Sequence, residues 1–167
     1  KDLDVTTCDI QNNSTGTIDD IIKVDGLLPY EDNSFDVIFL FDVLEHIKHD
    51  IKFLLECNRV LTSKGIIVVS VPFMYRFHEI PYDYRRYTPS GLEVTFNDSG
   101  FKIIELKNVG SFVFTAQTML LEHQVKINNL FRRIILKVVV KLLGFIKIRS
   151  EISKVAPFNF FCIAQKK

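Results

Sequence analysis

The chain has 167 residues, of which 47% are hydrophobic and 25% are charged. This composition excludes an intrinsically disordered chain, and the length suits one domain with its own core. The 21 basic and 20 acidic residues give a net charge of +1, so no overall positive field favours binding to nucleic acid.

Three strands are predicted in the first quarter of the chain. Residues 5–10 and 21–24 read as short strands, with the acids Asp9 and Asp25 at their ends. Residues 35–41 form an almost wholly apolar run between turn residues, which is typical of a strand covered on both faces.

The periodicity then changes to that of a helix. Apolar residues recur at helical spacing over residues 42–61, and Gly65 is a typical residue to end such a helix. Residues 66–71 are a β-branched run that predicts another buried strand, and a long aromatic and charged loop follows over residues 73–88.

The same alternation continues to the end of the chain. Thr88 before Pro89 predicts the start of a short helix, and a strand follows over residues 101–106. Residues 112–150 are helical in tendency and precede a last strand at 158–164. We therefore predict one α/β domain over the whole chain, with a mainly parallel sheet, helices on both faces, and 112–150 as a helical excursion.

The number and spacing of the cysteines indicate the redox state of the cellular compartment. The three cysteines are far apart, so neither a disulfide framework nor a CxxC metal site is expected from Cys8, Cys57 and Cys162. This pattern fits a reducing compartment, and we expect a cytoplasmic protein.

Acids at the predicted strand ends are candidate ligand-binding residues, because parallel α/β sheets bind ligands at the carboxyl ends of their strands. Asp9 can accept two hydrogen bonds from a ribose diol. Asp25 can accept from an adenine amino group, Gly26 lets the backbone approach the ring, and Leu27 can pack on it. Each of these acids and the glycine is equally explained as an ordinary turn residue.

Three spaced motifs carry a family resemblance. They are Asp-Gly-Leu-Leu-Pro-Tyr-Glu-Asp-Asn-Ser-Phe-Asp-Val-Ile from residue 25, Phe-Asp-Val-Leu-Glu-His-Ile from residue 41 and Asn-Arg-Val-Leu-Thr-Ser-Lys-Gly-Ile-Ile from residue 58. In this order they resemble the class I S-adenosylmethionine-dependent methyltransferases, in particular the type 11-like group that acts on small molecules, sugars and lipids. The resemblance implies a Rossmann-like sheet with an antiparallel last strand and S-adenosylmethionine as the cofactor.

The resemblance also implies roles for the strand-end residues. Asp9 would hold the ribose, Asp25, Gly26 and Leu27 would meet the adenine, and Phe41 with Asp42 would line the methionine end. The glycine-rich loop of the family is missing, since none of the seven glycines forms a Gly-x-Gly pair. We expect that loop, with the first strand and helix of the fold, to precede residue 1.

The loop at 73–88 is the predicted acceptor side. His78 is the candidate general base, because imidazole is the usual base near neutral pH, and Asp83 would orient it. The acceptor pocket is expected to be shaped by His46, Tyr84, Arg86 and Tyr87. The alternative is that Arg–Asp pairs and tyrosine stacking only hold the loop in place.

A metal site is a weaker candidate. Asp42, Glu45 and His46 have the spacing of one helix face, and their oxygen and imidazole atoms are suitable ligands for a divalent ion. Acids also favour a helix N-terminus without any metal. We therefore expect these residues to cap the helix or pack beneath the cofactor, with no metal bound.

The stretch at 130–149 is a basic amphipathic helix in sequence. Arg133, Lys137 and Lys141 recur every four residues in an otherwise apolar run that is too interrupted to span a membrane. Such a helix can lie on an anionic membrane surface, cover the acceptor site, dock a second subunit or close the core.

The predicted function is methyl transfer from S-adenosylmethionine to a small-molecule, sugar or lipid-linked acceptor, with no nucleic-acid partner. Contact with the inner face of a membrane would make a lipid-linked acceptor more plausible. The alternative is a non-catalytic methyltransferase-like module that binds a membrane or a partner through its basic helix.

Overall fold

The computed structural model describes residues 3–23, 27–110, 112–125, 129–144 and 157–167. Its centre is a four-stranded sheet in the order β3-β4-β6-β5. The strands are β3 (Phe35–Phe41), β4 (Leu61–Pro72), β5 (Phe101–Val109) and β6 (Asn159–Lys166). β3 and β4 are parallel, and β6 lies antiparallel between β4 and β5, so the predicted α/β fold with an antiparallel last strand is confirmed.

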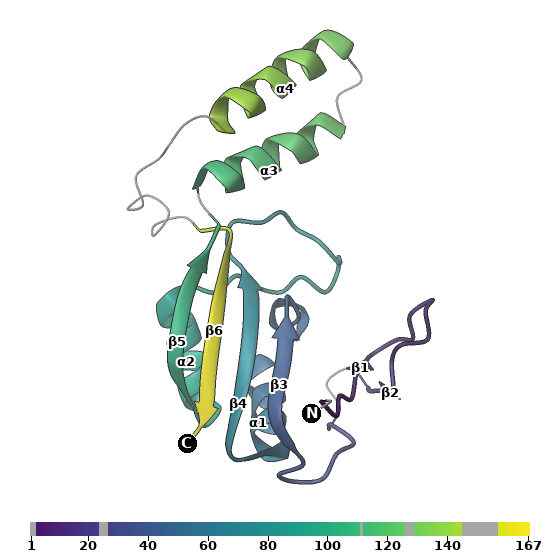
Figure 1. Ribbon diagram of the computed structural model, residues 1–167, viewed down its shortest axis with the longest axis vertical. Helices are drawn as coiled ribbons and strands as arrows, with labels where there is room; N and C mark the ends of the chain where they lie inside the picture. Colours follow the sequence, from purple (N-terminus) through teal and green to yellow (C-terminus); the bar gives the residue numbers. More distant parts are fainter. Residues whose placement is uncertain (1–2, 24–26, 111, 126–128, 145–156) are drawn as a thin grey trace.

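Two shorter strands form a separate parallel sheet beyond the β3 edge (Figure 1). They are β1 (Cys8–Asp9) and β2 (Asp20–Ile21), both shorter than predicted. The Tyr30 hydroxyl donates to Asp20 Oδ2 (3.1 Å), and the Tyr30 ring packs edge-on against Phe35 with centroids 4.9 Å apart. Tyr30 therefore joins this small sheet to the first strand of the large one.

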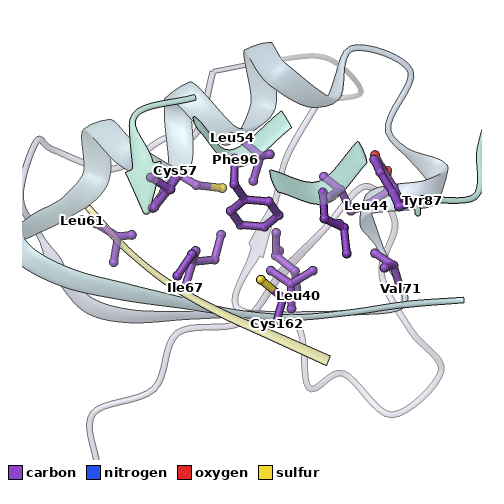
Figure 2. Packing of buried hydrophobic residues seen from close by; sticks show 14 of the residues in the cluster. Leu40, Leu44, Leu54, Cys57, Leu61, Ile67, Val71, Tyr87, Phe96 and Cys162 are labelled. Atoms are coloured by element: carbon purple, nitrogen blue, oxygen red, sulfur yellow. The ribbon is translucent and has the colours of Figure 1, made fainter. Parts of the chain in front are cut away.

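Two helices, α1 (Asp50–Val60) and α2 (Pro89–Asp98), cover one face of the large sheet. Phe96 of α2 is buried between Leu54 and Cys57 of α1 and the sheet residues beneath (Figure 2). On the other face, Val37, Phe39 and Phe41 of β3 are exposed among the described residues. The predicted cover on both faces is thus wrong for the described chain, because both faces of β3 are apolar and the sequence cannot show which one is packed.

The single helix predicted over 42–61 is also wrong. A 3-10 turn, η1 (Leu44–His46), comes first, and α1 begins only at Asp50. Asp42 has a φ of 52°, which belongs to a left-handed turn and not to a helix. Gly65 lies within β4 instead of ending the helix, at a bulge where a Cβ would come within 3.0 Å of Thr62 O.

The start of α2 is as predicted. Thr88 is the N-cap, its side chain accepts from Gly91 N at 3.1 Å, and Pro89 occupies the first turn. After α2, Gly100 has a φ of +79°, and its carbonyl accepts from the Asn58 side chain at 3.0 Å. This contact joins the end of α2 to α1.

A helical hairpin lies beyond the carboxyl ends of β3, β4 and β5 (Figure 1). It consists of α3 (Phe112–Val125) and α4 (Leu130–Gly144), and the Gln117 side chain donates to Val140 O at 2.9 Å. The last residues of the predicted 112–150 excursion lie outside the described residues. None of the described helices has the length and apolar content needed to cross a membrane.

One arginine of α1 holds the segment that follows the predicted adenine-binding residues. The Arg59 guanidinium donates to Leu28 O (3.0 Å), Tyr30 O (2.9 Å) and Asp32 Oδ1 (2.7 Å). It also pairs with Glu56, whose carboxylate accepts from Leu28 N and whose pKa is lowered chiefly by the hydrogen bond from Arg59. Residues 28–32 are therefore fixed to α1 by one planar cation.

We predict that Arg59→Lys lowers the free energy of unfolding by about 1–3 kcal/mol, because an ammonium cannot bond both carbonyls and both carboxylates at once. Urea unfolding measures the change. Lys52→Ala, an exposed change on the same helix, is the control and should stay near the wild-type value. Equal stability of Arg59→Lys and wild type would contradict the assignment.

Candidate functional site

The candidate site lies where β3 and β4 end, because their parallel pairing places Phe41 opposite Ser70. Asp42 connects the strands at this edge. Its backbone N–H donates to Ser70 O (3.0 Å), and its Oδ1 accepts from Ser70 Oγ (3.0 Å) and from Asn159 Nδ2 of β6 (2.9 Å). The carboxylate proposed for the methionine end of the cofactor therefore also ties three strands together.

The predicted donor side is only partly described. Asp9 ends β1 with its side chain exposed, and its Oδ1 accepts from Gln11 N at 3.2 Å. Asp25 and Gly26 lie outside the described residues, and Leu27 is exposed. Phe41 is 56% exposed at the end of β3. The roles of these residues toward a cofactor stay predictions.

The acceptor loop is built around a buried ion pair. Arg86 donates to both oxygens of Asp83, at 2.5 and 2.9 Å, and to Arg76 O at 2.9 Å. These hydrogen bonds lower the pKa of Asp83 to about 2, so its carboxylate is charged at neutral pH. Asp83 Oδ2 accepts from the His78 backbone N–H (3.0 Å) and lies 3.4 Å from His78 Nδ1.

His78 meets two residues of η1 at the edge of the sheet. His46 Nε2 lies 3.1 Å from His78 Nε2, and Glu45 Oε1 lies 3.7 Å from His46 Nε2 and 3.6 Å from His78 Nε2. Both imidazoles are largely buried, at 19% and 18% side-chain exposure. We call these three residues the Glu45–His46–His78 cluster.

Glu45 is the unusual member of this cluster. Its side chain is wholly buried, and neither carboxylate oxygen has a hydrogen-bond partner within the part of the chain that the structure describes. Burial raises the pKa of this carboxyl group above its ordinary value. An unpaired buried carboxyl is costly and needs an explanation.

The ligand set suggested by the sequence is therefore wrong in its grouping. Asp42, Glu45 and His46 do not share a helix face, because the chain turns at Asp42 before η1 begins. The Asp42 carboxylate instead bonds Ser70 and Asn159, and His78 joins Glu45 and His46. Sequence spacing missed this grouping because His78 comes from a distant loop.

The predicted pocket residues separate into two groups. Tyr84 is exposed beside the cluster, and its backbone N–H donates to Glu45 O at 3.0 Å. Tyr87 is buried in the core instead, where its hydroxyl donates to Asp50 Oδ2 at 2.9 Å, and burial raises its pKa. Since Asp50 also pairs with Arg85, Tyr87 anchors the end of the loop and does not line an exposed pocket.

Tyr75 contributes to the site although sequence reasoning did not select it. Its ring meets the His78 ring edge-on, with centroids 5.1 Å apart, and the Phe158 ring at 5.3 Å. It therefore fixes the His78 ring from the side of β6. The only signal in the sequence was the general richness of the loop in aromatic residues.

Part of the chain matches known proteins in sequence. Residues 3–69 match the family described as a methyltransferase domain. A probable S-adenosylmethionine-dependent methyltransferase of Mycobacterium tuberculosis is 44% identical over 45 residues, which are 27% of this chain and 16% of that protein. The matched part is thus a small share of the relative's length.

Two solved structures have a similar fold. The cyclase SpnF superposes with a TM-score of 0.55 at 19% identity, covering 92% of this chain and 57% of that one. A methyltransferase of Thermotoga maritima, titled a possible histamine N-methyltransferase, gives 0.54 at 14% identity, covering 91% and 65%. Residues 3–69 thus match a methyltransferase domain, and the chain shares the fold of these two solved structures.

Proposed function

We propose that the protein transfers a methyl group from S-adenosylmethionine to a small-molecule, sugar or lipid-linked acceptor. The observation that supports this best is the family match over residues 3–69, which contain Asp9, Asp25, Gly26 and Phe41. The acceptor loop folds back onto η1, which lies within this segment, through the contact of His78 with His46. Phe41 and Asp42 on the donor side and His78 on the acceptor side therefore lie near the ends of β3 and β4.

The chemistry asks little of the protein beyond alignment. The methyl group on a sulfonium is already activated, so transfer is an in-line displacement that needs donor and acceptor to be held in place. A hydroxyl or ammonium acceptor must also lose a proton. We propose that His78 assists this proton removal, and that the charged Asp83 carboxylate, fixed by Arg86, positions its ring.

Among the proposed acceptor classes, the α3–α4 hairpin favours a lipid-linked acceptor. On α4, seven apolar side chains are exposed: Leu130, Phe131, Ile134, Ile135, Val138, Val139 and Leu142. Arg132, Lys137 and Lys141 are exposed on the same helix, which has no acidic residue. An apolar face bordered by cations suits an anionic lipid surface, and we propose that α4 docks there from the cytoplasmic side.

Cofactor binding is the first test. We expect S-adenosylhomocysteine to bind in a calorimeter, and Asp9→Ala to weaken binding about tenfold or more, because the ribose diol loses a charged acceptor. Asp4→Ala, an exposed acid in the same segment, is the control. A folded full-length protein, with the segment expected before residue 1, that gives no heat would contradict the enzyme and favour the non-catalytic module.

Turnover separates the proposed role of His78 from a structural one. We expect His78→Ala to lower turnover of an oxygen acceptor about 100-fold or more while the affinity for S-adenosylhomocysteine stays within about twofold. Acceptors are screened with a methyl donor that carries a label. Equal loss of turnover and cofactor affinity would mark His78 as a structural residue.

Vesicle co-sedimentation tests the lipid surface. We expect the protein to bind vesicles that contain anionic lipid, and not neutral vesicles, with binding that weakens as salt screens the charges. Replacing Arg132, Lys137 and Lys141 by Gln should reduce binding about 100-fold, at about 1 kcal/mol for each cation. The control is a variant in which three exposed lysines outside α4 are replaced by Gln: Lys23, Lys52 and Lys102. Equal binding to anionic and neutral vesicles would contradict the proposal.

A further inference from the structure

The Glu45–His46–His78 cluster brings three potential ligand atoms to one point. The distances between His46 Nε2, His78 Nε2 and Glu45 Oε1 are 3.1, 3.6 and 3.7 Å. Two of the atoms come from η1 and the third comes from the loop that follows β4. Contacts between distant segments thus create the arrangement.

Hydrogen bonds on the far side of each ring assign the imidazole tautomers. His46 Nδ1 lies 3.1 Å from Tyr82 O, and His78 Nδ1 lies 3.3 Å from Arg76 O. A carbonyl oxygen can only accept, so each Nδ1 carries the hydrogen and each Nε2 of a neutral ring has a free lone pair. The two Nε2 atoms, which face each other, are then both acceptors.

Glu45 adds a third acceptor to the same point. Its oxygens are buried, and within the described residues they have no hydrogen-bond donor. Three lone-pair atoms that converge without a donor repel one another, and a cation between them would remove this repulsion. The cluster therefore has the electrostatic character of a cation site.

The spacing and the donor types indicate which cation fits. Ligands that hold Zn²⁺ tetrahedrally at ~2.0–2.1 Å lie about 3.3–3.4 Å from one another, and the observed distances of 3.1–3.7 Å bracket this value. Two imidazoles and one carboxylate suit divalent transition metals better than Mg²⁺ or Ca²⁺. We propose that Glu45, His46 and His78 bind one Zn²⁺-like ion and leave its fourth position open.

The surroundings support both ligand rings, as is usual around metal-bound histidines. Each Nδ1–H is directed at a backbone carbonyl, and the His78 backbone is held by Asp83, which Arg86 fixes in turn. The partial exposure of both rings leaves a way in from solvent. A site with three protein ligands and an open position is the catalytic type of zinc site.

The use of the ion rests on the proposed function, whereas its binding does not. An acceptor hydroxyl beside the ion would lose its proton to solvent more readily. Its oxygen then forms a bond to the methyl carbon as the bond from carbon to sulfur breaks, and the sulfonium becomes a neutral thioether. His78 thus assists proton removal as a ligand of the ion.

Metal titration tests the site directly. After treatment with a chelator, the protein is titrated with Zn²⁺ in a calorimeter, and we expect one ion per chain. Glu45→Gln, His46→Ala and His78→Ala should each weaken binding at least about tenfold. His49→Ala, a change at an exposed histidine outside the cluster, should bind as wild type does.

Several results would overturn the inference. These are no binding by the wild type, equal binding by the cluster variants, or an equal loss caused by His49→Ala. Circular dichroism shows whether each variant is folded. If Glu45→Gln unfolds, the test rests on His46→Ala and His78→Ala, because both of these histidines are partly exposed. Binding of Zn²⁺ without binding of S-adenosylhomocysteine would support the metal site and overturn the proposed function. Binding of S-adenosylhomocysteine without binding of Zn²⁺ would support the proposed function and overturn the metal site.

Discussion

The parallel pairing of β3 and β4 is the constraint on which the site depends. Two parallel strands end at the same edge, so the segments that follow Phe41 and Pro72 must start side by side. One segment becomes η1 and the other becomes the acceptor loop, which returns to η1 through the His46–His78 contact. Asp42 reinforces this edge by bonding Ser70 of β4 and Asn159 of β6. The residues that we propose for chemistry thus meet because of sheet topology, although they are far apart in the sequence.

Polar contacts hold the loops at both ends of β3 and β4, with Arg59 at the start of the strands and Arg86 beyond their carboxyl ends. Arg59 fixes residues 28–32 to α1. Within the acceptor loop, Arg86 joins Asp83 to the backbone carbonyl of Arg76. Tyr87 closes the loop by entering the core and donating to Asp50. Each tie uses a planar or rigid group with several partners, which gives a defined geometry for a small loss of side-chain entropy. Loops held in this way can present functional groups without secondary structure of their own.

Local signals in the sequence predicted what local physics determines. The apolar run of β3, the Thr88 and Pro89 start of α2 and the final strand follow from such signals, and the structure has all three. The periodicity over 42–61 failed because spacing alone does not reveal the left-handed turn at Asp42 that delays α1 to Asp50. The Glu45–His46–His78 cluster could not be predicted, since it depends on how a long loop returns. The sequence also placed Tyr87 in the acceptor pocket, because it cannot show that the tertiary fold buries this ring in the core.

The fold itself does not decide the reaction, since a cyclase and a methyltransferase both superpose on this chain. The acceptor loop and the α3–α4 hairpin both lie beyond the carboxyl ends of the strands, at the same end of the sheet (Figure 1). If α4 lies on an anionic membrane, that edge of the sheet faces the lipid surface. An acceptor held at that surface would then lie on the side of the sheet where β3 and β4 end, next to the His46 and His78 rings. Membrane docking through α4 would thus bring the acceptor to the same end of the sheet at which the parallel pairing of β3 and β4 assembles the Glu45–His46–His78 cluster.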